Sequence, residues 1–164
     1  MTTTSPPDQG PFLCAALLCE KLLLEQDGVS SAIRVIDRVT RTAAGPRPPE
    51  EMESFEYEVT LVVILKAGWT HGSHPLRIEM IRPPGETQVI LQQTVFFDGG
   101  EDRGVNVVSR MRLQLSQEGL YWFEVFLGSR MLTKIPMRVV YQRVFTPQRG
   151  ESEPSPPGPS HPSA

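Results

Sequence analysis

Apolar and polar residues alternate with a period of two along several stretches of the chain, most clearly over 104–116. One face of this stretch is largely apolar and carries Val105, Val107, Ser109, Met111, Leu113 and Leu115. The other face is mostly polar and carries Asn106, Val108, Arg110, Arg112 and Gln114. This period indicates a half-buried β-strand, because successive side chains of a strand point to opposite faces.

The same alternation predicts further strands over 55–66, 75–82, 87–97, 120–127 and 134–144. In the second half of 55–66, Val62 and Ile64 make both faces apolar, as in a strand that is covered on both sides. Turn residues separate these segments at Pro83-Pro84-Gly85-Glu86, Gln117-Glu118-Gly119 and Gly128-Ser129. Pro136 lacks a ladder donor, which predicts an edge or a bulge for that part of the last strand.

The stretch 12–29, "FLCAALLCEKLLLEQDGV", has three possible interpretations: an export signal, a helix or a core strand. An export signal is disfavoured because residues 1–11 contain no Lys or Arg and no suitable cleavage residue precedes either cysteine. A helix over 13–26 stays open, since Ala, Leu, Glu and Lys are good helix formers. Asp27-Gly28 is a strong hairpin signal and favours a strand that turns back into "SAIRVIDRV".

Composition divides the chain into one domain and two tails. Residues 1–11 and the Pro/Ser-rich stretch 146–164 cannot bury enough apolar surface to offset their ordering entropy, so we predict that both are disordered. Residues 42–54 are predicted to form a long Pro-rich surface loop for the same reason. The domain then spans 12–145, a length that can bury a core without disulfides.

About eight short strands joined by turns, with no segment that requires a helix, predict an all-β fold. We expect an antiparallel β-sandwich, either immunoglobulin-like or of the jelly-roll type. The topology of the sandwich does not follow from the sequence.

The net charge and the two cysteines argue against some classes of function and against an export location. The chain has 164 residues and a formal net charge of -3, which argues against a nucleic-acid or anionic-membrane binder. No apolar run approaches the roughly 20 residues that span a bilayer. Cys14 and Cys19 are five positions apart on one predicted strand, so they face opposite sides and a mutual disulfide is disfavoured. We expect both to be reduced and buried, in a cytoplasmic protein.

The order of these features resembles a bacterial family of small β-sandwich proteins of unknown function. The resemblance rests on "CEKLLLEQDGVSSAIRVIDRV", "EVTLVVIL", "LRIEMIRPPGE" and "GLYWFEVFLGSRMLTKIPMRVVY", and it covers roughly residues 12–143. It implies a sandwich fold and a bacterial origin. It assigns no catalytic residue, since the shared motifs are turn glycines and alternating apolar positions.

The best metal candidate is "GWTHGSHPLRIE", which places His71 and His74 before Glu79. Cupin-type sandwich enzymes use a glycine, two histidines separated by one residue and a glutamate. Gly68, His74 and Glu79 fit part of that spacing, but Leu76 stands where the second histidine is required. The alternative is that both histidines are exposed loop residues, since a catalytic metal normally has three protein ligands.

The sequence evidence for any other metal, anion-binding or catalytic site is weaker than for this histidine pair. Asp98, Glu101 and Asp102 form an acidic turn, which is either a calcium loop or a solvated turn. Arg110, Arg112 and Arg138 are either a basic patch or part of a solvated face. No nucleophile elbow, phosphate-binding loop, dinucleotide fingerprint or zinc-binding helix motif occurs, so we expect no enzyme and no cofactor.

Two aromatic residues suggest a binding surface. Trp122 and Phe126 fall on the strand face opposite Tyr121 and Phe123, and outward aromatics often mark a protein interface. The alternative is that this strand is covered on both faces. The main hypothesis is a non-enzymatic interaction module that binds a protein partner or itself, through Trp122 and Phe126 or through an open edge strand. The second is a small-ligand or metal-binding sandwich that uses His71, His74 and Glu79.

Overall fold

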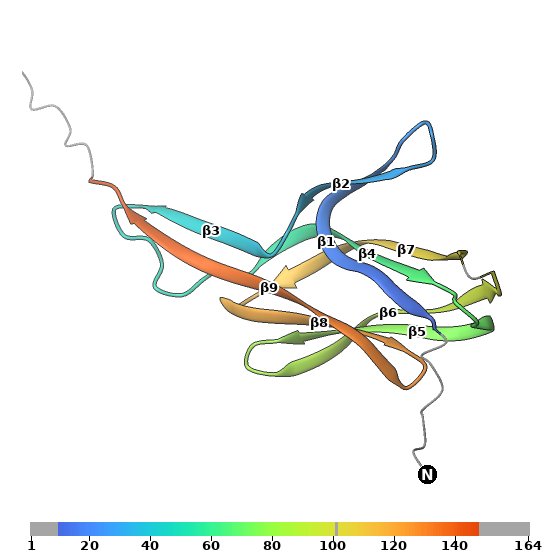
Figure 1. The fold of residues 1–164 in the computed structure, drawn as a ribbon. Coiled ribbons are helices and arrows are strands. Elements are labelled where there is room, and N and C mark those ends of the chain that lie inside the picture. The colour runs from blue at the N-terminus through green and yellow to red at the C-terminus, as the bar shows by residue number, and fades with distance from the viewer. Residues whose placement is uncertain (1–9, 101, 148–164) are drawn as a thin grey trace, which may run out of the picture.

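The computed structural model describes residues 10–100 and 102–147, and all regular structure in these residues is β-strand (Figure 1). The strands are β1 (Phe12–Leu24), β2 (Ser30–Val35), β3 (Arg38–Gly45), β4 (Phe55–Lys66), β5 (His71–Arg82), β6 (Glu86–Asp98), β7 (Gly104–Leu115), β8 (Gly119–Leu127) and β9 (Arg130–Phe145). The all-β prediction is therefore confirmed. Apart from residues 10, 11, 146 and 147, the two predicted disordered tails lie outside the described residues.

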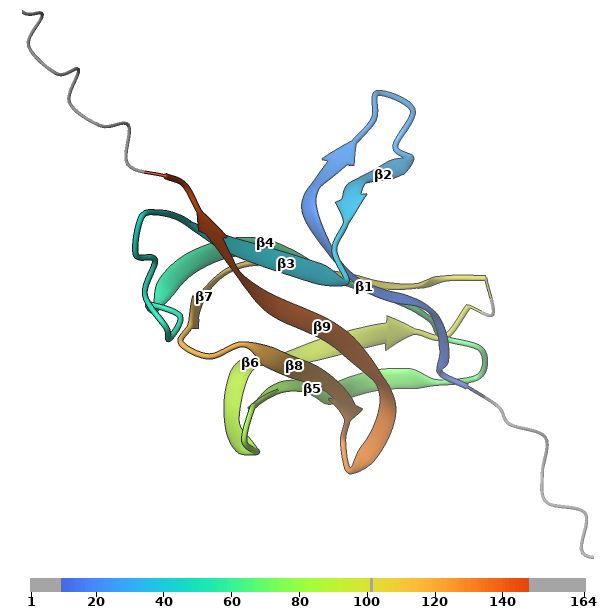
Figure 2. The same ribbon diagram turned by 90° about the vertical axis from the view of Figure 1, so that its left-hand side faces the viewer.

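The strands form two sheets, with the orders β2-β1-β4-β7 and β3-β9-β8-β5-β6. Figures 1 and 2 show the sheets as two layers of a sandwich. All pairs are antiparallel except β3 with β9, which run parallel from Arg38 opposite Arg138 to Gly45 opposite Phe145. The expectation of a purely antiparallel sandwich is thus wrong at this one pair, and the second sheet is mixed.

The core lies between the sheets, where alternate residues of each strand point inward. From β4 these are Val59, Leu61, Val63 and Leu65, and from β8 they are Tyr121, Phe123, Val125 and Leu127, all of them buried. This is the alternation predicted from the sequence. The buried Tyr121 hydroxyl donates to the Gln117 carbonyl at 2.9 Å, which satisfies its polar end at the β7–β8 turn.

The stretch with three interpretations is a strand, β1. Its first half pairs with β4 from Phe12 to Cys19, and its second half pairs with β2 from Cys19 to Leu24. The predicted Asp27-Gly28 turn joins β1 to β2. There the Val29 amide donates to Asp27 Oδ1 at 3.1 Å, and Gly28 has a φ of 83°, a conformation that glycine adopts without strain.

The segment after this turn holds two strands where the sequence suggested one. The first strand, β2, ends at Val35. The next residue, Ile36, is buried, and its amide donates to the Leu18 carbonyl at 2.8 Å. The Arg138 amide then donates to the Asp37 carbonyl, and β3 begins in the other sheet. The crossing from one sheet to the other explains the extra strand. It also corrects the predicted loop, because residues 42–45 belong to β3.

The remaining part of the Pro-rich loop, 46–54, folds back against the ends of β3 and β9. Tyr141 Oη donates to the Pro49 carbonyl at 2.8 Å, and Arg143 Nη2 donates to the Pro48 carbonyl at 3.2 Å. Pro48 is buried. The loop is therefore fixed to the sandwich at its middle.

The second half of β1 and all of β2 extend beyond the rest of the sandwich as a hairpin, which we call the arm (residues 20–35) (Figures 1 and 2). β2 pairs with β1 alone, and none of its residues is buried. Arg34 has a φ of 53°, which is uncommon for a residue other than glycine and kinks the end of β2.

β7 approaches β4 closely at Gly104, and a substitution there tests the pairing of these two strands. A Cβ atom at Gly104 would overlap the Leu65 carbonyl oxygen, which cannot move without breaking the β4–β7 pairing. We expect Gly104→Ala to lower the free energy of unfolding by about 1–3 kcal/mol in chemical denaturation.

Gly100, in the loop that precedes β7, is the matched control. A Cβ there would lie 3.0 Å from the flexible side chain of Arg103, which can move aside. Gly100→Ala should change the unfolding free energy by less than about 0.5 kcal/mol. Equal effects of the two substitutions would contradict the structure at this point.

Candidate interaction surface

The two histidines proposed as metal ligands are not in a loop, as the alternative expected, but in β5. The strand begins at His71 because β6 provides a partner along its whole length, with Asp98 opposite His71. His71 is exposed, and its Nδ1 donates to the Trp69 carbonyl at 3.0 Å. His74 is half-buried, with its ring edge against Phe97 at 5.6 Å between centroids.

The structure separates the three proposed ligands. His71 and His74 are three positions apart on one strand, so they face opposite sides of the sheet. Glu79 lies eight positions beyond His71, about 26 Å along an extended strand. Its carboxylate pairs with Arg77 at 3.1 Å. Within residues 10–100 and 102–147, no three His, Cys, Asp or Glu side chains form a group that could hold a metal.

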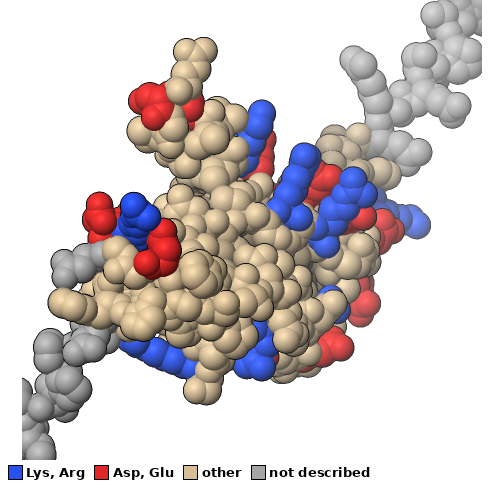
Figure 3. Space-filling model, turned by 90° about the vertical axis from the view of Figure 1, so that its right-hand side faces the viewer, with Lys and Arg blue, Asp and Glu red and all other residues tan. Residues whose placement is uncertain are grey.

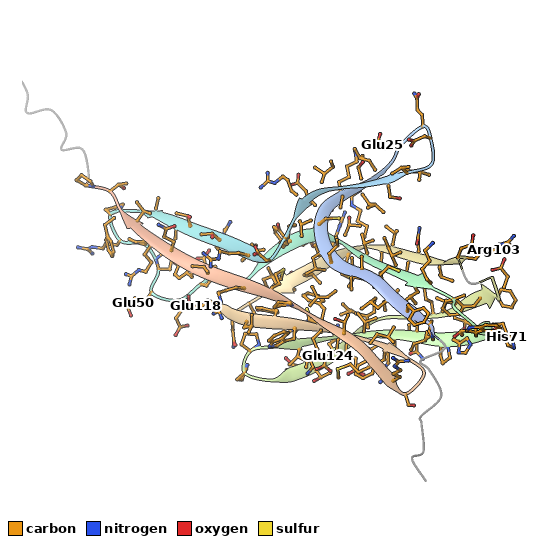
Figure 4. The ribbon with its side chains drawn as sticks, in the orientation of Figure 1. Glu25, Glu50, His71, Arg103, Glu118 and Glu124 are labelled. Carbon is orange, nitrogen blue, oxygen red and sulfur yellow. The ribbon has the colours of Figure 1, made fainter. Side chains whose placement is uncertain are left out.

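The acidic turn between β6 and β7 is also internally paired. Arg103 Nη1 donates to Asp98 Oδ2 at 2.8 Å, and this hydrogen bond lowers the pKa of Asp98 below its ordinary value. Lys66 Nζ donates to the Asp102 carbonyl at 2.9 Å. Glu101 lies outside the described residues. Figure 4 shows Arg103 at the same end of the sandwich as His71.

The three arginines of the possible basic patch lie in two sheets. Arg110 and Arg112 are on β7 and both contact Glu58 of β4, at 2.6 and 3.1 Å. The hydrogen bond from Arg110 is the main reason why the pKa of Glu58 falls below its usual range. Arg138 is on β9, in the other sheet. The arginines on β7 are thus balanced by a carboxylate and do not join Arg138 in one patch.

The two cysteines differ in burial, which corrects the expectation that both are buried. Cys19 is fully buried and Cys14 is exposed, and neither forms a disulfide. Cys14 lies at a register shift in β1, between Leu13 and Ala15, in the half of the strand that has no partner on its β2 side. Burial raises the pKa of the Cys19 thiol.

Trp122 and Phe126 lie on the outer face of the five-stranded sheet, as predicted, but both are half-buried. The guanidinium of Arg77 covers the Phe126 ring at 4.8 Å from its centroid. Between the two aromatics, Glu124 is only 7% exposed and pairs with Lys134 at 2.5 Å. Figure 4 shows Glu124 in the middle of this sheet. This face therefore already has intramolecular partners.

The sheet order leaves another surface open. β6 is the outermost strand of the five-stranded sheet, and between Glu86 and Asp98 it has no Lys, Arg, Asp, Glu or Pro. Val89 is 49% exposed and Phe96 is 63% exposed. β6 has one bulge, at Ile90, where its register with β5 shifts between Ile78 and Glu79, so Leu91–Asp98 is a regular stretch.

The other three outer strands carry charge. β3 carries Arg38 and Arg41, and β7 carries Arg110 and Arg112. β2 is short and carries Arg34. Figure 3 shows a broad surface without charged side chains below the arm, and charged side chains gather at its margins. An open edge strand was expected from the sequence without its position; the signal that identifies β6 is the uncharged run 87–97.

These features define a two-layer β-sandwich in which the outermost strand β6 is long and uncharged between its ends. Phe12–Leu18 of β1, beside which β2 does not extend, is a second and shorter uncharged stretch. The chain belongs to DUF6941, a family of unknown function, whose sequence profile matches residues 15–140. The resemblance to an uncharacterised family is thereby confirmed. No curated protein matches the sequence. Within the described residues, no helix is long and apolar enough to cross a membrane.

The difference between the cysteines gives a test by thiol labelling. We expect a maleimide or disulfide reagent to modify Cys14 rapidly in the native protein. Cys19 should react only after unfolding, because it is inaccessible and its raised pKa lowers the thiolate fraction.

The Cys14→Ser variant should lose the rapid phase, whereas Cys19→Ser should keep it. Rapid labelling of Cys19 in folded protein would show that β1 does not pair with β4 as described.

Proposed function

We propose that this protein is a non-enzymatic interaction module that binds an extended segment of a protein partner along β6. The observation that carries the proposal is the absence of charge and proline between Glu86 and Asp98 on an outermost strand. Natural sheets usually protect such edges with charges, prolines, bulges or short strands, because unpaired main-chain groups pair readily with another chain. Apart from the bulge at Ile90, β6 has none of these features between its charged ends, and this supports a binding role.

The rest of the sheet supports strand addition at β6. Over Leu76–Ile81, β5 pairs with β6 on one side and with β8 on the other, so this part of the edge rests on a strand that is fixed on both sides. A bound strand would gain affinity from main-chain hydrogen bonds, and alternate side chains would give specificity. Val89 and Phe96 provide exposed apolar contacts for those side chains.

Trp122 and Phe126 remain predicted contact residues of the neighbouring outer face. They lie on β8, so β5 separates them from the edge. A partner that covers them must displace Arg77 from the Phe126 ring, and we therefore place the primary contact at β6. The separation of His71, His74 and Glu79 gives no support to the metal-binding alternative. Two free thiols are compatible with a cytoplasmic location.

A charged residue on the edge should abolish binding. We expect Thr94→Lys on β6 to prevent strand addition, because a bound strand would have to desolvate the ammonium group or be held away from the edge. The measurement is photo-cross-linking in cell extract, with a benzophenone amino acid at Gln92 of β6. A discrete adduct is expected, and Thr94→Lys should remove it.

Thr42→Lys is the matched control, because Thr42 is also an exposed threonine on an outermost strand. This variant should leave the adduct unchanged. The proposal fails if the benzophenone at Gln92 gives no adduct, or if both lysine variants remove it equally.

A further inference from the structure

The arm has apolar side chains that the rest of the described chain does not cover. Leu24 is 76% exposed and Val35 is 61% exposed, and Val29 and Ile33 are exposed as well. β2 also presents an unpaired edge, because it pairs with β1 alone. Ile33 and Val35 share one face of the arm, and Leu24 lies on the other face. Exposed apolar side chains on a projecting hairpin are typical of a surface that contacts another chain.

The tip and the foot of the arm carry opposite charges. Glu25 and Asp27 lie at the tip, and Figure 4 shows Glu25 on the arm, away from the sandwich. Arg38 and Arg138 lie at the foot, where β3 begins. Within the described residues, neither acid has an ion pair, and neither do these two arginines.

The two arginines are direct neighbours. Arg38 and Arg138 are register partners in the parallel β3–β9 pair, and both are exposed. Like charges at such positions repel each other and destabilise the pair unless an anion compensates them. Asp37 is adjacent in sequence, but only its carbonyl contacts this pair, as acceptor of the Arg138 amide. The foot of the arm is thus suited to a carboxylate from outside the chain.

The arm is complementary to a second copy of itself. The eight residues from Gly28 to Val35 span about 26 Å when extended, which separates the acidic tip from the basic foot. If two arms lie side by side and antiparallel, each tip meets the foot of the other, and the two β2 edges face each other. A two-fold dimer requires this property, since the same surface must supply both sides of the contact.

We propose that two copies of this chain form a two-fold dimer through antiparallel packing of their arms. In this dimer, Val29, Ile33 and Val35 become buried, and the tip of each arm contacts Arg38 and Arg138 of the other copy. An unrelated partner would have to reproduce both the charge order and the spacing, whereas a second copy has them already. This contact is separate from the β6 edge and does not depend on its function.

A charge-reversal cycle tests the dimer by sedimentation equilibrium. The wild-type chain should be dimeric at about 100 µM, and Glu25→Lys or Arg38→Glu alone should weaken dimerisation by about tenfold or more. The double variant, Glu25→Lys with Arg38→Glu, restores opposite charges and should recover most of the affinity. Asp27 is left unchanged because its carboxylate accepts the Val29 amide in the turn.

Two controls distinguish this contact from others. Glu50→Arg reverses an exposed acid in the Pro-rich loop and should leave the dimer intact, and so should Thr94→Lys on β6. Circular dichroism establishes that each variant is folded. A wild-type monomer at this concentration, a double variant as weak as the single ones, or a dimer abolished by Thr94→Lys would each overturn the proposal.

Discussion

The structure depends on one constraint, which is that every main-chain N–H and C=O of a sheet needs a partner. Inside the two sheets the neighbouring strands supply these partners, while inward side chains such as Leu61 and Phe123 fill the core. Two open sheets have four edges, and each of them must meet water or another chain. In this molecule the outermost strands β2, β3 and β7 carry arginines, whereas β6 carries no charge between its ends, and neither does the half of β1 that β2 does not cover.

Local patterning predicted most of the fold. The alternation over 104–116 and 120–127 identified the inward residues, and Asp27-Gly28 identified the first hairpin, because both signals depend only on neighbouring residues. The boundary between β2 and β3 could not be predicted, since Ile36-Asp37 contains no glycine or proline and the chain crosses to the other sheet there. The parallel pairing of β3 with β9 depends on a contact between distant segments.

For the candidate sites too, the sequence predicted what depends on neighbouring residues and missed what depends on contacts between distant strands. Sequence spacing brought His71, His74 and Glu79 together as a possible ligand set, but on a strand this spacing separates them. Trp122 was correctly placed on an outer face, yet its partial burial depends on neighbouring strands. The uncharged run 87–97 is visible in the sequence, and only the sheet order shows that it forms an edge.

The central claim is that β6 is an open edge used for strand addition. Residue-resolved amide hydrogen exchange of β5 and β6 tests this claim most directly. In the dilute isolated chain, the β6 amides that do not bond to β5 should exchange far faster than those of β5. In the purified complex with the cross-linked partner, the same amides should become protected. Uniform protection of β6 in the isolated chain, or unchanged exchange in the complex, would contradict the account.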